Sequence, residues 1–135
     1  MKHYVFDSYA LIAFFKKEKS WELIQDLLIK MSNDGITGWI TAINVSEIYY
    51  MIYRKNSAKQ ADLAIEALLN FPLNLIEADL KLALQAAKLK AAYKLSYADA
   101  FAAALTISKK AVLLTGDQEF LNLKDEKDFE VLFIN

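Results

Sequence analysis

Residues 3–17 read HYVFDSYALIAFFKK, and this stretch decides the fold class of the chain. Its first part, HYVF, is a short apolar run that predicts a buried strand, and the strand ends at the carboxylate of Asp7. Leu11, Phe14 and Phe15 then recur at helical spacing, so a helix follows directly. The stretch therefore predicts a step from strand to helix with an acid at the junction.

The same step repeats along the rest of the chain. Apolar runs predict further strands at 36–41 (ITGWIT), 73–78 (LNLIEA), 111–115 (AVLLT) and 129–135 (FEVLFIN). Helical patterns cover 20–31, 41–54, 57–71, 79–94 and the alanine-rich stretch 96–110, with a short helix after Asp117. Strands that alternate with helices imply a mostly parallel sheet covered on both faces. We therefore expect a three-layer α/β/α fold with a central, mostly parallel sheet.

The length and composition indicate one dense globular domain. The chain has 135 residues, 56% of them hydrophobic, which suits a single core. It has only three Gly and one Pro, which argues against disorder and against a loop-dominated scaffold. We expect a single domain over residues 1–135.

Several absences narrow the cellular setting. The chain has no cysteine, which excludes disulfides and thiolate metal sites and suits a reducing compartment. No run approaches the ~20 apolar residues that a membrane span needs, and the N-terminus turns polar at Asp7. We expect a soluble, cytoplasmic protein with no membrane contact. The net charge of −1 gives no overall basic field, so any contact with nucleic acid must be local.

Four acids stand near the N-termini of predicted helices: Asp7, Glu47, Asp99 and Asp117. In parallel sheets, reactive groups gather beyond the carboxyl ends of the strands, so these acids should share one cleft. Two charges 4 Å apart repel by about 4 kcal/mol at an effective dielectric near 20, so such a cluster needs protonation or a cation. Magnesium, which prefers oxygen ligands, meets that need, whereas zinc is disfavoured because the only histidine, His3, begins an apolar strand.

Helix capping is the alternative explanation for each acid taken alone. Asp and Glu are common in first helical turns, where they accept free N–H groups and oppose the helix dipole. Ser96 and Asp99 have nearly the spacing of a capping box, Asn44 and Glu47 share that spacing, and Asp117 precedes a short helix. Only the joint placement of the acids favours a functional site.

Four fragments carry a resemblance to a known family: VFDSYALIA (5–13), NVSEIYY (44–50), LSYADAFAAALT (95–106) and VLLTGDQEF (112–120). In this order they resemble PIN domains, especially the VapC-type toxins of toxin-antitoxin pairs. The resemblance implies a PIN-like fold and a metal-dependent endoribonuclease that hydrolyses phosphodiester bonds of single-stranded RNA.

The resemblance also implies residue roles and partners. Asp7, Glu47, Asp99 and Asp117 would bind one or two Mg²⁺ or Mn²⁺ ions, and Thr115 would orient water or substrate beside Asp117. The expected partners are an RNA substrate, a VapB-type antitoxin and a second copy in a homodimer. For Thr115, an ordinary β-branched residue at a strand end is the competing interpretation.

Two surface patterns bear on these partners. The chain has sixteen Lys and Arg residues, and three groups of them could flank the cleft and contact phosphates: Lys16, Lys17 and Lys19; Arg54, Lys55 and Lys59; Lys88, Lys90 and Lys94. Tyr49, Tyr50 and Tyr53, with Ile52, cover too much of one helix for a single core stripe. We expect part of that face to form a dimer surface or an antitoxin groove.

Three other classes compete with this interpretation. A haloacid-dehalogenase-like phosphatase needs a second acid two residues after the first, where Tyr9 stands. A phosphoacceptor receiver domain needs a late lysine at a strand end, where AVLLTGD supplies an aspartate. The remaining alternative is a non-catalytic PIN-like module that binds protein or RNA without cutting, which the sequence leaves open.

Overall fold

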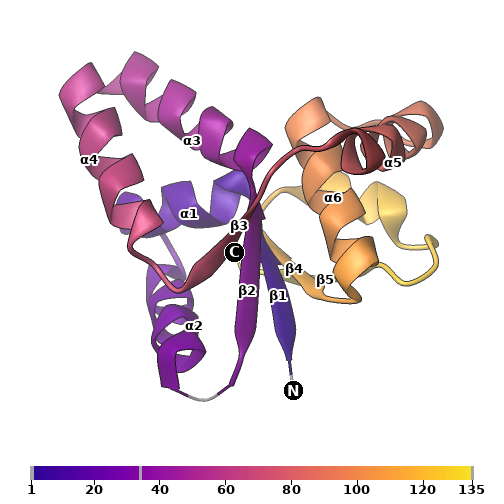
Figure 1. Ribbon diagram of the computed structural model, residues 1–135, viewed down its shortest axis with the longest axis horizontal. Helices are drawn as coiled ribbons and strands as arrows, with labels where there is room; N and C mark the ends of the chain where they lie inside the picture. Colours follow the sequence, from indigo (N-terminus) through magenta and orange to yellow (C-terminus); the bar gives the residue numbers. More distant parts are fainter. Residues whose placement is uncertain (1, 34, 135) are drawn as a thin grey trace.

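A five-stranded parallel sheet forms the centre of the computed structural model, which describes residues 2–33 and 35–134 (Figure 1). Residues 1, 34 and 135 of the predicted domain lie outside the described residues. The strands are β1 (His3–Phe6), β2 (Thr37–Thr41), β3 (Leu73–Ile76), β4 (Val112–Thr115) and β5 (Glu130–Phe133). The helices are α1 (Ser8–Phe15), α2 (Trp21–Asn33), α3 (Ala42–Lys55), α4 (Ala58–Leu69), α5 (Leu80–Ala92), α6 (Tyr97–Lys109) and the short η1 (Gln118–Leu123).

The strand order is β3-β2-β1-β4-β5, and every neighbouring pair is parallel. The predicted α/β fold is confirmed. Receiver domains such as CheY have the order 2-1-3-4-5, so the topology excludes that alternative. From β1 the strands that follow in sequence, β2 and β3, lie on one side, whereas β4 and β5 lie on the other. The place between β1 and β4 is therefore the topological switch point, where open α/β sheets bind ligands.

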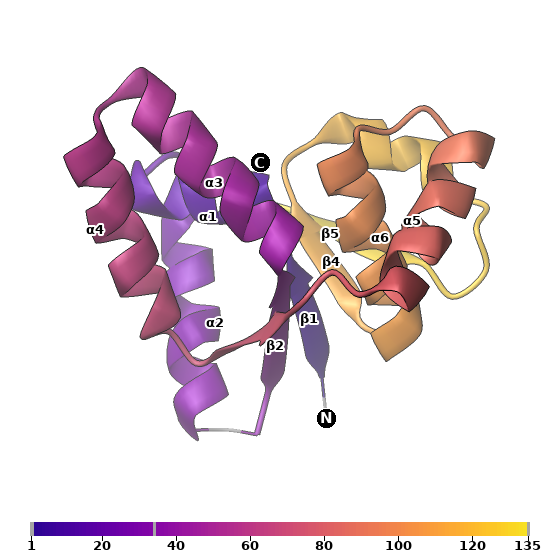
Figure 2. The same ribbon diagram turned by 45° about the horizontal axis from the view of Figure 1, so that its top comes forward.

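Two apolar cores fill the spaces on either side of the sheet. Phe6 and Leu114 pack with α1 to α4 on one face, whereas Val5 and Leu113 pack with α5, α6 and η1 on the other (Figure 2). Neighbouring residues of a strand point to opposite faces, and both faces are buried, which explains the continuous apolar runs. Helix α6 lies close to the sheet because its inner side is lined by alanine, with Ala102 fully buried.

The helix starts follow their capping residues closely. Asp7 caps α1, Thr41 caps α3, Ser96 caps α6 and Asp117 caps η1. The predicted helix boundaries are correct to within a few residues, and the short helix after Asp117 is of the 3-10 type. The capping-box spacing of Asn44 and Glu47 does not mark the start of α3. Thr41 is the N-cap of this helix, because its Oγ1 accepts the Asn44 amide at 3.0 Å.

Among the described residues, every helix is too short or too polar to span a bilayer.

Candidate active site

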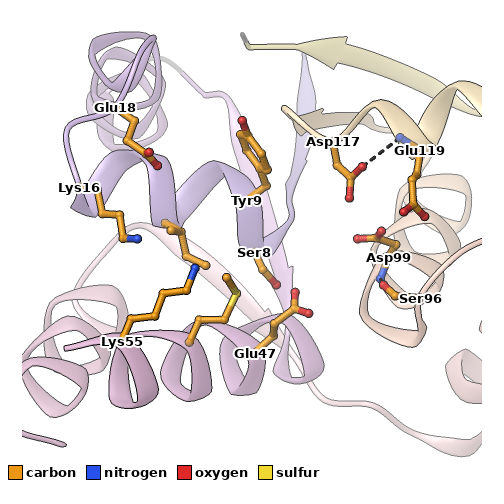
Figure 3. Close-up of a pocket in the computed structure, with 12 residues that line it drawn as sticks. Ser8, Tyr9, Lys16, Glu18, Glu47, Lys55, Ser96, Asp99, Asp117 and Glu119 are labelled. Atoms are coloured by element: carbon orange, nitrogen blue, oxygen red, sulfur yellow. Dashed lines mark hydrogen bonds between the residues drawn. The ribbon is translucent and has the colours of Figure 1, made fainter. Parts of the chain in front are cut away.

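A cleft of about 410 Å³ lies at the carboxyl end of the sheet, beside the switch point (Figure 3). Three of the four predicted acids line it: Glu47, Asp99 and Asp117. Its acidic end also includes Glu119, and Lys16, Lys55 and Glu18 lie at the opposite end. The cleft is therefore acidic at one end and carries both signs of charge at the other.

Asp7 lies behind this cleft and is almost fully buried, with 1% of its surface exposed. One carboxylate oxygen accepts the amide of Ala10 at 2.9 Å, and the other accepts the hydroxyl of Thr115. Burial raises the pKa of Asp7 to about 7; the two hydrogen bonds oppose that rise, and the charges of Asp117 and Glu47 add to it. Asp7 thus caps a helix and also belongs electrostatically to the acid cluster.

Thr115 joins the acids that follow β1 and β4. Its fully buried hydroxyl donates to Asp7 and accepts the backbone N–H of Asp117 at 2.9 Å. With its hydroxyl committed in this way, the side chain fixes the position of the two aspartates.

Asp99 and Asp117 point toward one another across the cleft (Figure 3). Asp99 sits in the first turn of α6, where Ser96 Oγ accepts its amide at 3.2 Å, and Asp117 Oδ1 accepts the amide of Glu119 at 2.9 Å. Burial raises the pKa of Asp99 to about 8, helped by the charges of Asp117 and Asp7 and by a hydrogen bond shared with Asp117. The carboxyl of Asp99 therefore holds its proton more tightly than a free aspartic acid does.

The donor set fits a hard divalent cation. All of the predicted ligands are carboxylates. Burial first, and then the charges of neighbouring acids, raise the pKa of Asp7 and Asp99, and a cation would offset both effects. Within residues 2–33 and 35–134, no three His, Cys, Asp or Glu side chains stand close enough to enclose one ion. Magnesium takes only one or two carboxylates directly and keeps several waters, so the facing pair Asp99 and Asp117 is sufficient for first contact.

Asn44 holds together the helix ends that carry the acids. Its side chain is fully buried, and its Nδ2 donates to Ser8 Oγ and to the Ala98 carbonyl oxygen, both at 3.2 Å. Ser8 Oγ in turn donates to the Asn44 carbonyl at 3.2 Å, and Thr41 Oγ1 donates to Asn44 Oδ1 at 2.5 Å. These bonds connect α1, α3 and α6 next to Asp7, Glu47 and Asp99.

Asn44→Ala should therefore lower the free energy of unfolding by about 2 to 4 kcal/mol, because the buried Thr41 hydroxyl would lose its acceptor, and Ser8 Oγ and the Ala98 carbonyl would each lose a donor. Urea unfolding measures this change. The matched control is Thr106→Val, since Thr106 is equally buried but bonds only the Ala102 carbonyl within its own helix, at 2.8 Å. Any activity of the site, measured per folded molecule, should fall in Asn44→Ala and persist in the control; equal activity in both would show that the network does not position the acids.

Sequence reasoning missed several residues of the cleft. Of the three lysine groups, Lys16 and Lys55 line it, whereas Lys90 donates to the Leu95 carbonyl at 2.7 Å on another surface. Tyr9 and Glu119 also line it. Both lie two residues from a predicted acid, and that short distance was the available signal.

The fold and the site place this chain in one class: α/β proteins whose parallel sheet has a cluster of carboxylates at its switch point. The PIN domain family matches residues 4–126. The chain therefore belongs to the PIN domain family. No curated protein matches the sequence.

Solved structures share the fold at low sequence identity. VapBC2 from Rickettsia felis, solved with a fragment of promoter DNA, has a TM-score of 0.75 at 17% identity, covering 98% of this chain and 99% of its own. DNA-bound VapBC from Salmonella typhimurium has a TM-score of 0.75 at 14% identity, with both chains covered completely (100%). VapC20 from Mycobacterium tuberculosis, a toxin that cleaves the sarcin-ricin loop, has a TM-score of 0.72 at 13% identity, covering 90% and 95%.

Proposed function

We propose that this chain is a metal-dependent endoribonuclease that hydrolyses single-stranded RNA, and that it is the toxin of a VapBC-type toxin-antitoxin module. The observation that carries the proposal is the facing pair Asp99 and Asp117 at the switch point, with Asp7 buried behind it. Burial, and then the charges of neighbouring acids, raise the pKa of Asp7 and Asp99. Membership of the PIN family and the VapC-type fold neighbours support it.

In this proposal each residue has a physical task. Asp99, Asp117 and Glu47 would hold one or two Mg²⁺ or Mn²⁺ ions, Asp7 adds negative charge from behind, and Thr115 fixes Asp7 against Asp117. Asp99, whose pKa is raised, would have to give up its proton to hold a cation. The ion supplies charge stabilisation for the phosphate oxygens and lowers the pKa of a water that it binds.

The proposed partners follow from the fold neighbours and the surface. Two of those neighbours were solved as VapBC bound to DNA, so we propose a VapB-type antitoxin for this chain. We also propose a cytoplasmic homodimer that uses the exposed face of α3, where Tyr50 and Tyr53 are 55% and 52% exposed. Light scattering at micromolar concentration tests the dimer, and a monomer would contradict it.

The primary test of the activity is cleavage of RNA by the purified, partner-free chain. Transfer and ribosomal RNA are incubated with Mn²⁺, Mg²⁺ or EDTA, beside Asp7→Asn as control. Discrete fragments that require both metal and Asp7 are the expected result. Intact RNA under every condition, together with no binding of Mn²⁺, would support the non-catalytic binding module instead.

The two lysines of the cleft should contact backbone phosphates on one side of the cut, because both lie at the end of the cleft opposite Asp99 and Asp117. Lys16→Glu and Lys55→Glu should each weaken the binding of a single-stranded RNA. Each should also make binding less dependent on salt: the slope of log K against log salt should become shallower by about 0.7 for each phosphate that the protein no longer binds. Fluorescence anisotropy at several salt concentrations measures both quantities. Lys81→Glu, on the exposed surface of α5 outside the cleft, is the control, and an equal change there would make the effect one of overall charge.

A further inference from the structure

Tyr9 stands out among the residues of the cleft because it is an exposed aromatic ring in a buried segment. Its neighbours Ser8 and Ala10 are 3% and 0% exposed, whereas Tyr9 is 43% exposed. The ring belongs to neither apolar core but lines the cleft with Asp99 and Asp117. Figure 3 shows it rising between the lysines and Asp117, with the hydroxyl pointing away from Glu47.

The backbone of Gly116 holds this ring in place. A Cβ at residue 116 would lie 2.0 Å from Tyr9 Cε1, 2.5 Å from Cζ and 2.7 Å from Cδ1. One edge of the ring therefore occupies the space that any other residue at 116 would need. Because Gly116 lies between Thr115 and Asp117, the ring is fixed relative to the acid cluster while much of its surface stays open to solvent.

A fixed, exposed aromatic ring beside a phosphate-cutting site has the properties of a stacking platform. Single-stranded RNA is recognised largely by bases that stack on aromatic side chains. Removal of one such ring weakens binding by about 5- to 100-fold, and the contact tolerates any base because every base has a π-face. The ordering cost is low here, since Gly116 already restricts the ring.

We propose that Tyr9 forms a subsite that stacks one nucleobase of single-stranded RNA next to the phosphate held at the acid cluster. This inference rests on the proposed function. Lys16 and Lys55 then face the backbone phosphates that lead away from this base, at the far end of the cleft. A structural role for Tyr9 as a cover over Gly116 would require only the ring edge, and leaves its 43% exposure without a purpose.

The test couples the side chain to individual bases of the ligand. Fluorescence anisotropy in Ca²⁺ gives the affinity of the protein for a labelled single-stranded RNA of mixed sequence. The same measurement is made with a series of this RNA in which each member has one abasic position. Tyr9→Leu should bind the intact RNA about 5- to 100-fold more weakly, and Tyr9→Phe should retain the affinity. One abasic position should weaken binding to the unmodified chain and have no effect in Tyr9→Leu.

Tyr97→Leu is the matched control, because Tyr97 is 61% exposed in the first turn of α6 but does not line the cleft. Melting temperatures of all variants exclude a loss of folding. The inference is overturned if Tyr9→Leu responds to every abasic position as the unmodified chain does, or if Tyr97→Leu weakens binding as much. It is also overturned if Tyr9→Leu binds RNA normally and fails only to bind the antitoxin.

The outcome separates this inference from the proposed function. Coupling between Tyr9 and one base without cleavage of any RNA would support the stacking subsite and contradict the nuclease. Metal-dependent cleavage with unchanged KM in Tyr9→Leu would support the nuclease and contradict the subsite. Removal of the stacking ring should raise KM more than it lowers kcat, because the base stacks equally in the ground state and in the transition state.

Discussion

Asp99→Asn should reduce RNA cleavage in Mn²⁺ by about 10³-fold, because a divalent cation contributes several kcal/mol of charge stabilisation that this carboxylate helps to hold. The same substitution should make the metal-free protein more stable at pH 7. Burial and the neighbouring acids raise the pKa of Asp99 to about 8, so this group destabilises the folded state, and a neutral amide removes that cost. Reduced activity together with increased stability in one variant is the expected signature.

Thermal melting with and without Mn²⁺ completes this test. The unmodified chain should be stabilised by the ion, by about 2.7 kcal/mol at one hundred times its Kd, and Asp99→Asn should show little of this gain. Asp26→Asn, an exposed acid of α2 outside the cleft, serves as control and should change neither quantity. Equal melting shifts in the unmodified chain and Asp99→Asn would show that Asp99 does not bind the ion.

The metal-free protein should become less stable as pH rises from 5 to 8. Asp7 has a pKa of about 7 in the folded state against 3.8 for the free side chain, so the folded state binds more protons across this interval. Its contribution is therefore fully present below pH 3.8 and disappears as pH rises through about 7. Asp7 alone should account for about 2 to 3 kcal/mol between pH 5 and 7, and Asp99 acts in the same direction.

Urea unfolding in EDTA at several pH values measures this slope. Asp7→Asn should flatten it, and Mn²⁺ should restore stability above pH 7 because the ion binds the ionised carboxylates. A stability that rises with pH over the same interval would mean that the acids are paired with cations or hydrogen-bond donors rather than crowded together.

The periodicity of the sequence was sufficient to predict the strands, the helices and the sheet, because the central strands are buried on two faces and most helices begin at a capping residue. Asp7 and Asp117 could be placed together because the carboxyl ends of parallel strands meet at one edge, whereas Asp99 follows no strand and reaches this edge from the first turn of α6. The strand order itself could be tested only in three dimensions. It depends on pairing β1 with β4, over a separation that local patterns do not report.

The supporting residues of the site were beyond local patterns. Asn44 has the spacing of a helix cap, yet its side chain crosses to α1 and α6, and only the packing of three helices determines that choice. The contact of Tyr9 with Gly116 likewise joins residues from opposite ends of the chain. Sequence spacing identified the acids, whereas the groups that orient them required the tertiary structure.

The bond between Thr115 and Asp7 joins residues 108 positions apart. During translation, Asp7, Glu47 and Asp99 are made before β4, but Thr115 and Asp117 are not yet present to complete the cluster. A nascent chain that stops before residue 112 therefore lacks both the strand that pairs with β1 on this side and the acid that faces Asp99. The acidic site that the proposed function requires is therefore completed only after residue 117 has been made.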